Sequence, residues 1–267
     1  MRMFRSPTTV LFVLLVVAAL VTSACSGGSE VYKEIKERGT LIVGTSADYA
    51  PWEYVDEAGD FAGYDIELIR EIGERMDLEV EIQDMGFDTL ISALKQGKID
   101  VVIAAMSITE KRLEQVDFTD GYYDGAHGFI VKSGSGISLS KPEELADYTV
   151  GVQTGTTHEE WIITNLVDEG EMSEDQISRY EKADQGALDV KNGRIDVFIA
   201  DLPAAKGFVE SMSDLEIALE YDLTPGEPQA IAVPKGADDL CTEINKVLEE
   251  LKGEGFLDGL QEKHLIQ

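Results

Sequence analysis

The sequence predicts an α/β fold made of two doubly wound lobes, and three observations support this prediction. Short apolar runs that suit buried strands alternate with segments of helical spacing. A segment that begins at residue 95 occurs again from residue 191, which suggests two lobes of about a hundred residues each. The chain has 267 residues and is 43% hydrophobic, which is enough apolar material for two moderate cores.

The alternation of strands and helices is clearest in the first half of the chain. Residues 41–44 form a short apolar run that ends in Gly, as is typical of a buried strand. Asp65 is expected to be the N-cap of a helix that follows it. Residues 78–82 alternate as a strand does, residues 90–94 have helical spacing, and residues 101–105 are continuously apolar. The last pattern predicts a strand that is covered on both faces.

The repeated segment predicts one structural unit that is used twice. Residues 95–105 read KQGKIDVVIAA, and residues 191–201 read KNGRIDVFIAD. The shared Gly suits the end of a helix, and the run after it suits the start of a buried strand. Two convergent helix-to-strand connections are the alternative, because this turn chemistry occurs in unrelated proteins. We favour duplication, because most of the positions are identical.

The charge of the chain argues against two kinds of partner. The sequence has 52 Asp and Glu residues against 22 Lys and Arg residues, which gives a formal charge of −30. Proteins that bind nucleic acids need a basic surface, so we expect no nucleic-acid partner. The same charge disfavours docking on an anionic membrane through a basic patch.

The start of the chain predicts export. Two arginines precede an apolar run over residues 10–21, which is short for a membrane span and typical of a signal peptide. The small residues that follow, ending at Cys25, resemble a bacterial or archaeal lipoprotein signal, which implies lipid attachment at Cys25. Ordinary cleavage nearby is the alternative. We predict a signal peptide over residues 1–24, a tether over residues 25–38, and an anchored protein on the extracytoplasmic face, in the periplasm or at the cell surface.

Four loops are expected to meet in a cleft between the lobes, because ligands of open α/β sheets bind beyond the carboxyl ends of the strands. These loops are residues 46–52, 105–112, 154–158 and 201–203. Thr156 and Thr157 precede an expected helix, whose N-terminus offers N–H groups to an anion. Arg112 can hold a carboxylate with two hydrogen bonds, and Asp201 can balance an ammonium group. These groups together suit the head group of an α-amino acid.

Plainer interpretations of these residues remain open. Trp52 suits a hydrophobic core as well as a ligand contact, and Thr156 suits a helix cap. Arg112 could form a surface ion pair with Glu110 or Glu114, which would contribute little to stability or binding. Arg112 and Asp201 each follow a predicted buried strand, and this position favours a functional role for both.

Several segments resemble the amino-acid-binding proteins of ABC importers, the extracellular solute-binding proteins of family 3. The matching segments are residues 44–54, 63–68, 107–112, 116–123, 151–157 and 200–203. They occur in the order found in that family and span nearly all of the chain after the signal. The resemblance implies a periplasmic-binding-protein-like fold, in which two lobes joined by a two-segment hinge close over one amino acid. Residues 39–125 with 230–267 would form lobe 1, and residues 126–229 would form lobe 2.

The resemblance also implies which residues touch the ligand. Arg112 would take the α-carboxylate with help from Ser107, and Asp201 would meet the α-ammonium with the Ala105 carbonyl. Tyr49 and Phe87 would flank the side chain, and Gln153 and Glu53 would lie near its end. The predicted ligand-binding set is Ser46, Tyr49, Trp52, Phe87, Ala105, Met106, Ser107, Arg112, Gln153, Thr156, Thr157 and Asp201. No catalytic residue, cofactor or metal ligand belongs to this prediction.

The side chain of the ligand is less well defined than its head group. Ser46 occupies a position where some relatives carry an Asp that pairs with cationic or amide side chains. Residues 46–51 resemble arginine-binding relatives, whereas residues 120–123 resemble glutamine-binding ones. We expect a polar or basic amino acid, with arginine narrowly favoured over glutamine. A monomer would deliver it to an ABC permease and its ATPase.

An exported cyclohexadienyl dehydratase-like enzyme on the same fold is the alternative, with Glu53 as its general acid. The sequence contains neither a Gly-x-Ser-x-Gly motif nor a Gly-rich phosphate loop. Its three histidines, His127, His158 and His264, are not spaced for a metal with another His or Cys. We therefore expect a binding protein, and neither an enzyme nor a metal site.

Overall fold

The structure is a computed structural model that describes residues 30–265. The signal peptide predicted over residues 1–24 and the lipid attachment predicted at Cys25 lie outside the described residues. Within residues 30–265, no helix is both long and apolar enough to cross a membrane.

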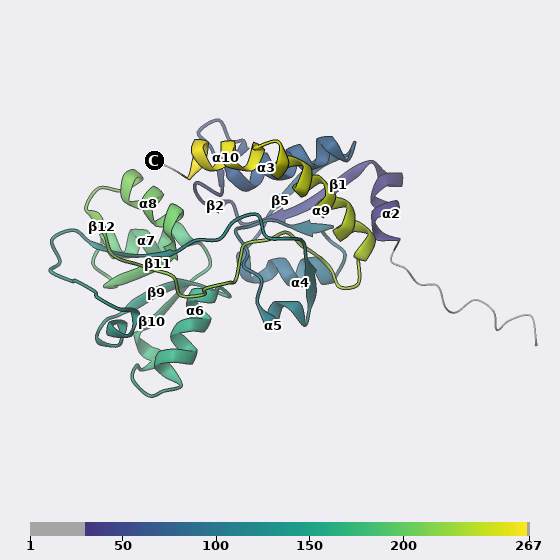
Figure 1. Ribbon diagram of the computed structural model, residues 1–267. Coiled ribbons are helices and arrows are strands. Elements are labelled where there is room, and N and C mark those ends of the chain that lie inside the picture. Colours follow the sequence, from purple (N-terminus) through teal and green to yellow (C-terminus); the bar gives the residue numbers. More distant parts are fainter. Residues whose placement is uncertain (1–29, 266–267) are drawn as a thin grey trace, which may run out of the picture.

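Two five-stranded sheets form the cores of two lobes, which lie side by side (Figure 1). The first sheet has the order β5-β1-β6-β13-β7, and the second has the order β10-β9-β11-β8-β12. In both sheets the first three strands are parallel, and the fourth runs antiparallel to both of its neighbours. The two lobes therefore share one sheet topology, and the predicted α/β fold class is confirmed.

The strands of the first sheet are β1 (Thr40–Thr45), β5 (Glu79–Asp84), β6 (Val101–Val102), β7 (Val116–Phe118) and β13 (Ala232–Pro234). Those of the second are β8 (His127–Lys132), β9 (Val150–Gln153), β10 (Ile177–Tyr180), β11 (Val197–Asp201) and β12 (Leu215–Tyr221). A small antiparallel sheet contains β2 (Asp48–Tyr49), β3 (Glu53–Val55) and β4 (Phe61–Ala62).

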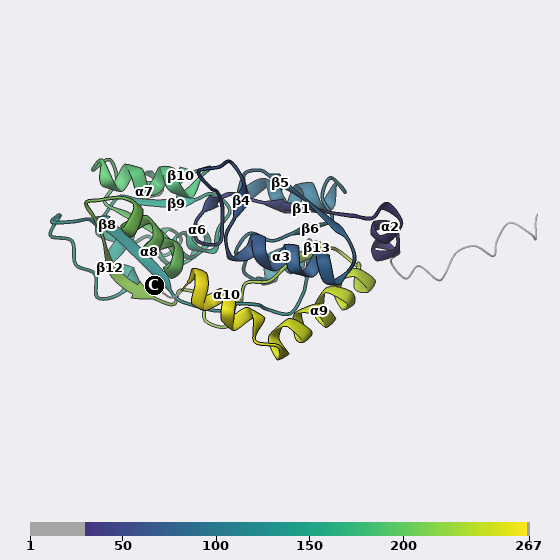
Figure 2. The ribbon, with the colours of Figure 1, turned by 90° about the horizontal axis from the view of Figure 1, so that it is seen from above.

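Helices cover both faces of each large sheet (Figures 1 and 2). In the first lobe α3, α9 and α10 pack together, and α4 packs against β1, β6 and β13. In the second lobe α7 and α8 pack against β8 and β11, whereas α6 packs against β9. The α-helices are α2 (Val31–Arg38), α3 (Tyr64–Arg75), α4 (Leu90–Lys95), α5 (Glu110–Leu113), α6 (Thr157–Ile162), α7 (Ala183–Lys191), α8 (Leu202–Ser211), α9 (Asp238–Gly253) and α10 (Phe256–His264). Shorter helical turns occupy Phe87–Thr89, Pro142–Asp147, Ile163–Val167 and Glu174–Gln176.

The continuous apolar runs have a direct structural explanation in β11. Its side chains alternate between two hydrophobic clusters on opposite faces of the sheet. Phe198 and Ala200 pack with α7 and α8, whereas Val197 and Ile199 pack into the second cluster. A central strand that is covered on both faces has no solvent-facing position, so its sequence shows no polar alternation.

The chain passes between the lobes twice, from β7 to β8 and from β12 to β13 (Figure 1). The two connections run beside each other, because Gln229 forms backbone hydrogen bonds with Tyr122 and Tyr123. Strands from residues 40–118 and 232–234 build one large sheet, and strands from residues 127–221 build the other. The lobe boundaries at 125/126 and 229/230 stay predictions.

The two repeated segments adopt the same local conformation. The shared Gly, at Gly97 and Gly193, has φ values of 67° and 68°. In both copies a helix ends before this Gly and a strand begins a few residues after it, as β6 or β11. The strand occupies the third position of its sheet in both lobes. This agreement supports the prediction of one unit used twice.

Two local predictions in the first lobe are wrong. Asp65 is not the N-cap of α3, because the helix begins at Tyr64 and Gly63 occupies the cap. Gly63 has φ 119°, and a Cβ atom there would lie 2.2 Å from the Trp52 carbonyl oxygen, so only glycine fits. Asp65 is instead buried inside the first turn. The strand predicted over residues 101–105 stops at Val102.

The tether predicted over residues 25–38 is also partly wrong, because Val31–Arg38 form helix α2. Ile35 is buried and joins the core of the first lobe, and α2 contacts β1 and α9. The sequence did not indicate this helix, because it is short, rich in charged residues and has one buried position, Ile35. Residues 31–38 therefore belong to the folded lobe and do not form a tether.

Candidate ligand-binding site

A cavity lies where loops of the two lobes meet. From the first lobe it is lined by Tyr49, Glu53, Phe87, Ala104, Ala105, Ser107 and Arg112, and from the second by Gln153, Thr156, Thr157, His158 and Asp201. Most of the predicted ligand-binding residues are in this set.

Three predicted residues do not line the cavity. Ser46 is buried and donates a hydrogen bond to Asp48 (2.8 Å). Trp52 is fully buried and packs against two tyrosine rings, so its interpretation as a core aromatic is correct. Met106 is buried in the core on the α4 side of the first sheet. These three residues are buried and do not belong to the cavity lining.

Arg112 is buried, with only 7% of its surface exposed. Helix α5 positions it, because the cap residue Thr109 accepts the Arg112 backbone N–H. The guanidinium donates to the carbonyls of Ser107 (2.7 Å) and Gly155 (3.1 Å) and lies 5.4 Å from the Phe87 ring centroid. Guanidinium has five N–H donors, so donors remain for a ligand anion.

The alternative of a surface ion pair for Arg112 is wrong. The group is buried, and none of the ion pairs formed within residues 30–265 includes it. Burial lowers the pKa of Arg112 to about 10, which still leaves the group charged at neutral pH. A buried cation without a paired carboxylate is costly. The site therefore favours an anionic group beside Arg112.

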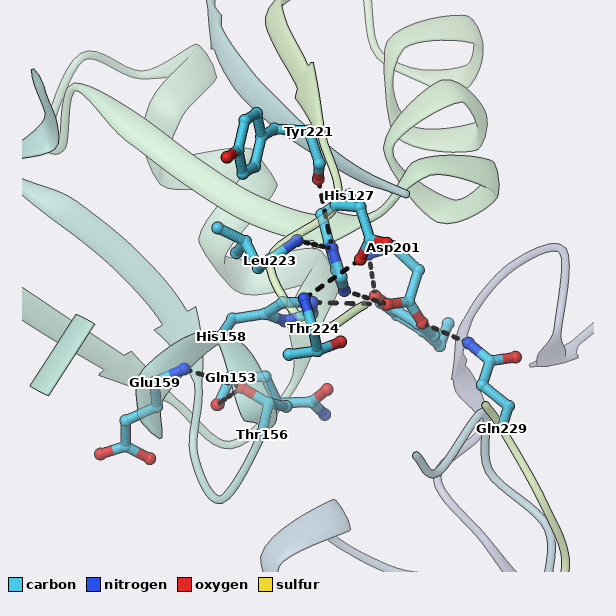
Figure 3. A network of polar contacts seen from close by, with 12 residues as sticks. His127, Gln153, Thr156, His158, Glu159, Asp201, Tyr221, Leu223, Thr224 and Gln229 are labelled. Carbon is cyan, nitrogen blue, oxygen red and sulfur yellow. Dashed lines mark hydrogen bonds and ion pairs between the residues drawn. The ribbon is translucent and has the colours of Figure 1, made fainter. Parts of the chain in front are cut away.

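Asp201 stands at the end of β11, and its two carboxylate oxygens have different surroundings (Figure 3). Oδ2 accepts a hydrogen bond from Gln229 Nε2 (2.9 Å). Oδ1 lies 3.4 Å from His158 Nε2 and 3.7 Å from His127 Nε2. Asp201 is therefore held by one oxygen and presents the other to two imidazoles at the cavity wall.

The register of the second sheet explains why His127 lies beside Asp201. β8 and β11 are antiparallel, and His127 is directly opposite Asp201. The Leu223 backbone N–H lies 3.1 Å from His127 Nδ1, and the Tyr221 carbonyl oxygen lies 3.3 Å away (Figure 3). Burial lowers the pKa of His127 to about 4, so its ring is neutral at physiological pH.

Two buried carboxyl groups form the acidic end of the cavity region. Glu53, on β3, lines the cavity with 1% of its surface exposed, and its Oε2 has no hydrogen-bond partner among the described residues. Asp65 Oδ2 accepts the Ala105 backbone N–H (2.7 Å) and the Tyr122 hydroxyl (2.9 Å). Burial raises the pKa of Glu53 well above its ordinary value and that of Asp65 to about 7, and the neighbouring carboxyl raises that of Glu53 further.

Hydrogen bonds across the cleft join the two lobes. The Arg112 bond to Gly155 is one of them. The Asp201 backbone N–H donates to the Tyr49 hydroxyl oxygen (2.7 Å). Asp48 accepts the backbone N–H of Ala183 (2.5 Å). The lobes are therefore in contact around the cavity, and most of the lining side chains are shielded from bulk water.

The threonines of the second lobe have mixed roles. Thr156 caps α6 by accepting the Glu159 N–H, and its hydroxyl donates to the Gln153 carbonyl (2.7 Å), so its interpretation as a cap is correct. Thr157 is buried and also lines the cavity.

Sequence reasoning missed His127 and His158 as members of the site. His158 lies in one of the loops predicted to face the cleft, and this position was the available signal. His127 gave none, since its place beside Asp201 depends on strand register.

Comparison with known proteins places the chain in a family. Residues 41–267 match the bacterial extracellular solute-binding proteins, family 3. The arginine-binding extracellular protein ArtP of Bacillus subtilis (strain 168) is 34% identical over 255 residues, which cover 94% of this chain and 96% of that protein. A Streptococcus pneumoniae amino acid ABC transporter substrate-binding protein bound to L-arginine is 28% identical, with a TM-score of 0.80, over 88% of this chain and 97% of the other.

An ancestral arginine-binding protein has been solved with two ligands. Bound to arginine, it is 38% identical, with a TM-score of 0.78, over 85% of this chain and 98% of the other. Bound to glutamine, it is 37% identical, with a TM-score of 0.78, over 86% and 99% of the two chains. The chain described here belongs to the bacterial extracellular solute-binding proteins of family 3.

Proposed function

We propose that this protein binds one free L-amino acid in the cavity between its lobes and delivers it to an ABC importer, with arginine favoured over glutamine. The named ligands of its relatives support an amino acid, and those of ArtP and the Streptococcus pneumoniae protein support arginine. The ancestral protein was solved with either arginine or glutamine, so relatives alone do not choose between the two. The choice of arginine depends on the charges of the cavity.

The head group of an amino acid suits two opposite charges of the site. Arg112 would hold the α-carboxylate with the N–H groups that Ser107 and Gly155 leave free. Asp201 Oδ1 lies at the opposite wall and would accept the α-ammonium. A zwitterionic head group would therefore neutralise both buried charges.

The surroundings of Glu53 favour a ligand with a cationic side chain. Its carboxyl group lines the cavity, is almost fully buried, and has one oxygen without a hydrogen-bond partner in the described structure. A guanidinium could donate to this oxygen and would stabilise the charged carboxylate. The amide of glutamine could donate as well, but it brings no positive charge to offset the burial that raises the pKa of this carboxyl.

Titration calorimetry with four compounds tests this proposal. L-citrulline has the shape of L-arginine but an uncharged end group, and agmatine lacks the carboxylate. We expect L-arginine to bind at least about tenfold more tightly than L-citrulline, L-glutamine or agmatine, since a hydrogen bond to a charged group contributes about 1.5–3 kcal/mol. Tighter binding of L-glutamine than of L-arginine would overturn the choice of ligand.

A pair of variants tests the role of Glu53. We expect Glu53→Gln to reduce the preference for L-arginine over L-citrulline by about tenfold, because the charged partner is lost. Glu57→Gln is the matched control, since Glu57 is exposed in the turn between β3 and β4 and lies outside the cavity lining. An unchanged preference in Glu53→Gln would contradict the assignment.

We also propose that the protein works as a lipid-anchored monomer outside the cytoplasm. The apolar run that ends at Cys25 and the short polar segment after it support the anchor. Cys25→Ser should release the protein from membranes without changing its affinity for the ligand. Retention of the variant on membranes would contradict the anchor. Light scattering of the soluble variant measures the oligomeric state, and loss of the gene should reduce uptake of labelled arginine.

The enzyme alternative has one feature in its favour. Burial keeps the pKa of Glu53 high, so the group can hold a proton at neutral pH, as a general acid must. Incubation with prephenate or arogenate, followed by analysis of the products, separates the two functions. Turnover that is lost in Glu53→Gln would favour the enzyme.

A further inference from the structure

Two imidazoles and one carboxylate converge at one wall of the cavity. His127 Nε2, His158 Nε2 and one Asp201 oxygen all lie within 4.8 Å of one another (Figure 3). The carboxylate oxygen is 3.7 Å from the first nitrogen and 3.4 Å from the second. In a tetrahedral zinc site with bonds of about 2.0–2.1 Å, ligand atoms are about 3.3 Å apart. Both oxygen-to-nitrogen separations are therefore close to the value that a shared metal ion requires.

The surroundings of these residues leave donor atoms available. His158 Nε2 is buried and has no hydrogen-bond partner within the part of the chain that the structure describes. Buried polar atoms of native proteins nearly always have a partner, so an unpaired one that faces a carboxylate calls for an explanation. A metal ion between the nitrogen and the carboxylate would provide that partner.

Outer contacts can orient two of the three ligands. The His127 Nδ1–H could donate to the Tyr221 carbonyl oxygen, which lies 3.3 Å away, and Nε2 would then be free to bind a metal. In this structure Nδ1 accepts the Leu223 N–H (3.1 Å), so metal binding at Nε2 would require Nδ1 to take the proton and exchange this bond for the one to the Tyr221 carbonyl. Gln229 holds the other oxygen of Asp201. Carbonyl and amide groups often hydrogen-bond to metal ligands in this way and orient them.

We propose that His127, His158 and Asp201 bind a divalent transition metal ion such as Zn²⁺. Imidazole and carboxylate ligands suit zinc, nickel and copper better than calcium or magnesium. Since His158 and Asp201 line the cavity, the remaining coordination position faces the space where a ligand would lie.

The site has a consequence that depends on the proposed amino-acid binding. Asp201 Oδ1 is the oxygen assigned to the α-ammonium and also the oxygen between the two imidazoles. One oxygen in this narrow space cannot hold a metal ion and an ammonium group together. Metal and amino acid therefore compete, and the metal acts as an inhibitor of ligand capture.

Titration of the protein with Co²⁺, purified without a histidine tag and without amino acid, tests the site directly. Tetrahedral Co²⁺ has a visible absorption band that Zn²⁺ abolishes by displacement. We expect one equivalent to bind, and His158→Gln to weaken binding at least about tenfold, since even the loss of a residue that hydrogen-bonds to a metal ligand costs about 10–100-fold. Asp201→Asn should have a similar effect and provides a second variant if the first folds poorly.

His264→Gln is the matched control for the metal titration. His264 is the remaining histidine of the sequence, and its Nε2 pairs with Glu67 at 3.0 Å on α3, away from the cavity lining. This variant should bind Co²⁺ as the wild type does. The proposal is overturned if wild-type protein shows no saturable Co²⁺ binding, or if binding is unchanged in both His158→Gln and Asp201→Asn.

A second titration separates the metal site from the proposed function. We expect one equivalent of Zn²⁺ to raise the apparent Kd for L-arginine at least tenfold in the wild type. Metal binding with no effect on arginine affinity would overturn the competition. Co²⁺ binding in a protein that captures none of the amino acids would contradict the proposed function and leave the metal site standing. Arginine binding in a protein that does not bind Co²⁺ would contradict the metal site and leave the proposed function standing.

Discussion

The two copies of the repeated segment begin in the same way. In the first copy the Asp100 carboxylate accepts the Ile42 backbone N–H (2.7 Å), and the Asp100 N–H donates to the Ile42 carbonyl (2.7 Å). In the second copy Asp196 makes the same pair of bonds with Thr149, at 2.9 and 3.0 Å. Each Asp therefore attaches the start of its strand to the neighbouring strand. The short shared sequence is sufficient to build this connection twice.

The two copies end differently, and the difference builds the site. β11 pairs with antiparallel β8 over five residues and stays regular as far as Asp201, whereas β6 meets β13 only at Ala232 and ends at Val102. At the equivalent last position Ala105 has φ 45°. The chain can therefore bend in the first lobe, and Arg112 enters the cavity after the bend. In the second lobe the strand itself carries the charged group. Sequence near the turn sets where a strand starts, and its partner strand sets where it ends.

The largest effect that we expect concerns Asp65, whose carboxylate holds the end of the first copy. The Ala105 N–H donates to the Asp65 carboxylate, whereas the equivalent Asp201 N–H donates to the Tyr49 hydroxyl oxygen. Burial raises the pKa of Asp65 from 3.8 to about 7, so the folded protein keeps a proton that the unfolded chain loses between these values. This contribution to stability is fully present below about pH 4 and is lost as pH rises through 7, by about 1.4 kcal/mol per pH unit at most.

Urea unfolding between pH 4 and 8 measures this dependence on pH. We expect Asp65→Asn to lose much of the decline in the free energy of unfolding that the wild type shows over this range. Tyr49→Phe is the control, because it removes the hydrogen bond at the end of the second copy and keeps the buried carboxyl. It should lower stability and leave the pH slope unchanged. Equal slopes in the wild type and Asp65→Asn would show that Asp65 does not hold the proton.

The second effect concerns ligand affinity at the first lobe. We expect Arg112→Ala to weaken binding of the amino acid at least tenfold, since a charge-assisted bond contributes about 1.5–3 kcal/mol. Arg112→Lys should recover only part of the loss, because an ammonium lacks the two-pronged geometry of guanidinium. Calorimetric titration measures the three affinities. Arg194→Ala removes a surface arginine paired with Asp189 and should change nothing. Equal affinities for wild type, Arg112→Ala and Arg112→Lys would refute the carboxylate contact.

The third effect tests whether the two copies begin in an equivalent way. Asp100→Ala and Asp196→Ala should each lower the free energy of unfolding by about 1–3 kcal/mol, since each leaves a backbone N–H of a neighbouring strand without its partner. The corresponding Asn variants keep an acceptor oxygen and should lose less. Denaturant midpoints for all four variants measure the differences. A large loss of unfolding free energy in one variant and none in the other would contradict the equivalence of the two copies.

The smallest effect is expected at Ala105. Its φ of 45° lies in the left-handed region, where a non-glycine residue is strained by about 1–2 kcal/mol. Ala105→Gly relieves this strain and increases the entropy of the unfolded chain, so the free energy of unfolding should change by less than about 1 kcal/mol. Ala104→Gly is the control, because Ala104 is buried and has no positive φ. Ala104→Gly should destabilise the protein more than Ala105→Gly does. Thermal unfolding of both variants measures this, and a larger loss in Ala105→Gly would contradict the strain at Ala105.

Features that depend only on neighbouring residues could be predicted from the amino-acid sequence. Apolar runs located the buried strands, because a strand covered on both faces has no room for polar positions. The Gly-x-Ile-Asp turn located both copies of the repeat, since its Gly needs positive φ and its Asp bonds to backbone. Arg112 and Asp201 were found by their position after these strands. Such features are encoded within about ten residues of chain, so they can be read without knowing the fold.

Contacts between residues far apart in the chain depend on the folded structure and could not be predicted from the sequence. His127 faces Asp201 because β8 and β11 pair in one register, and a shift of one residue would have turned the imidazole to the other face. Trp52 belongs to the core and Asp65 supports Ala105 because the first lobe packs around them. The physical reason is that register and packing are set by the summed burial of many residues, whereas local sequence fixes only turns and caps. Sequence therefore predicted the charges for the amino-acid head group, and the fold brought the two imidazoles beside one of them.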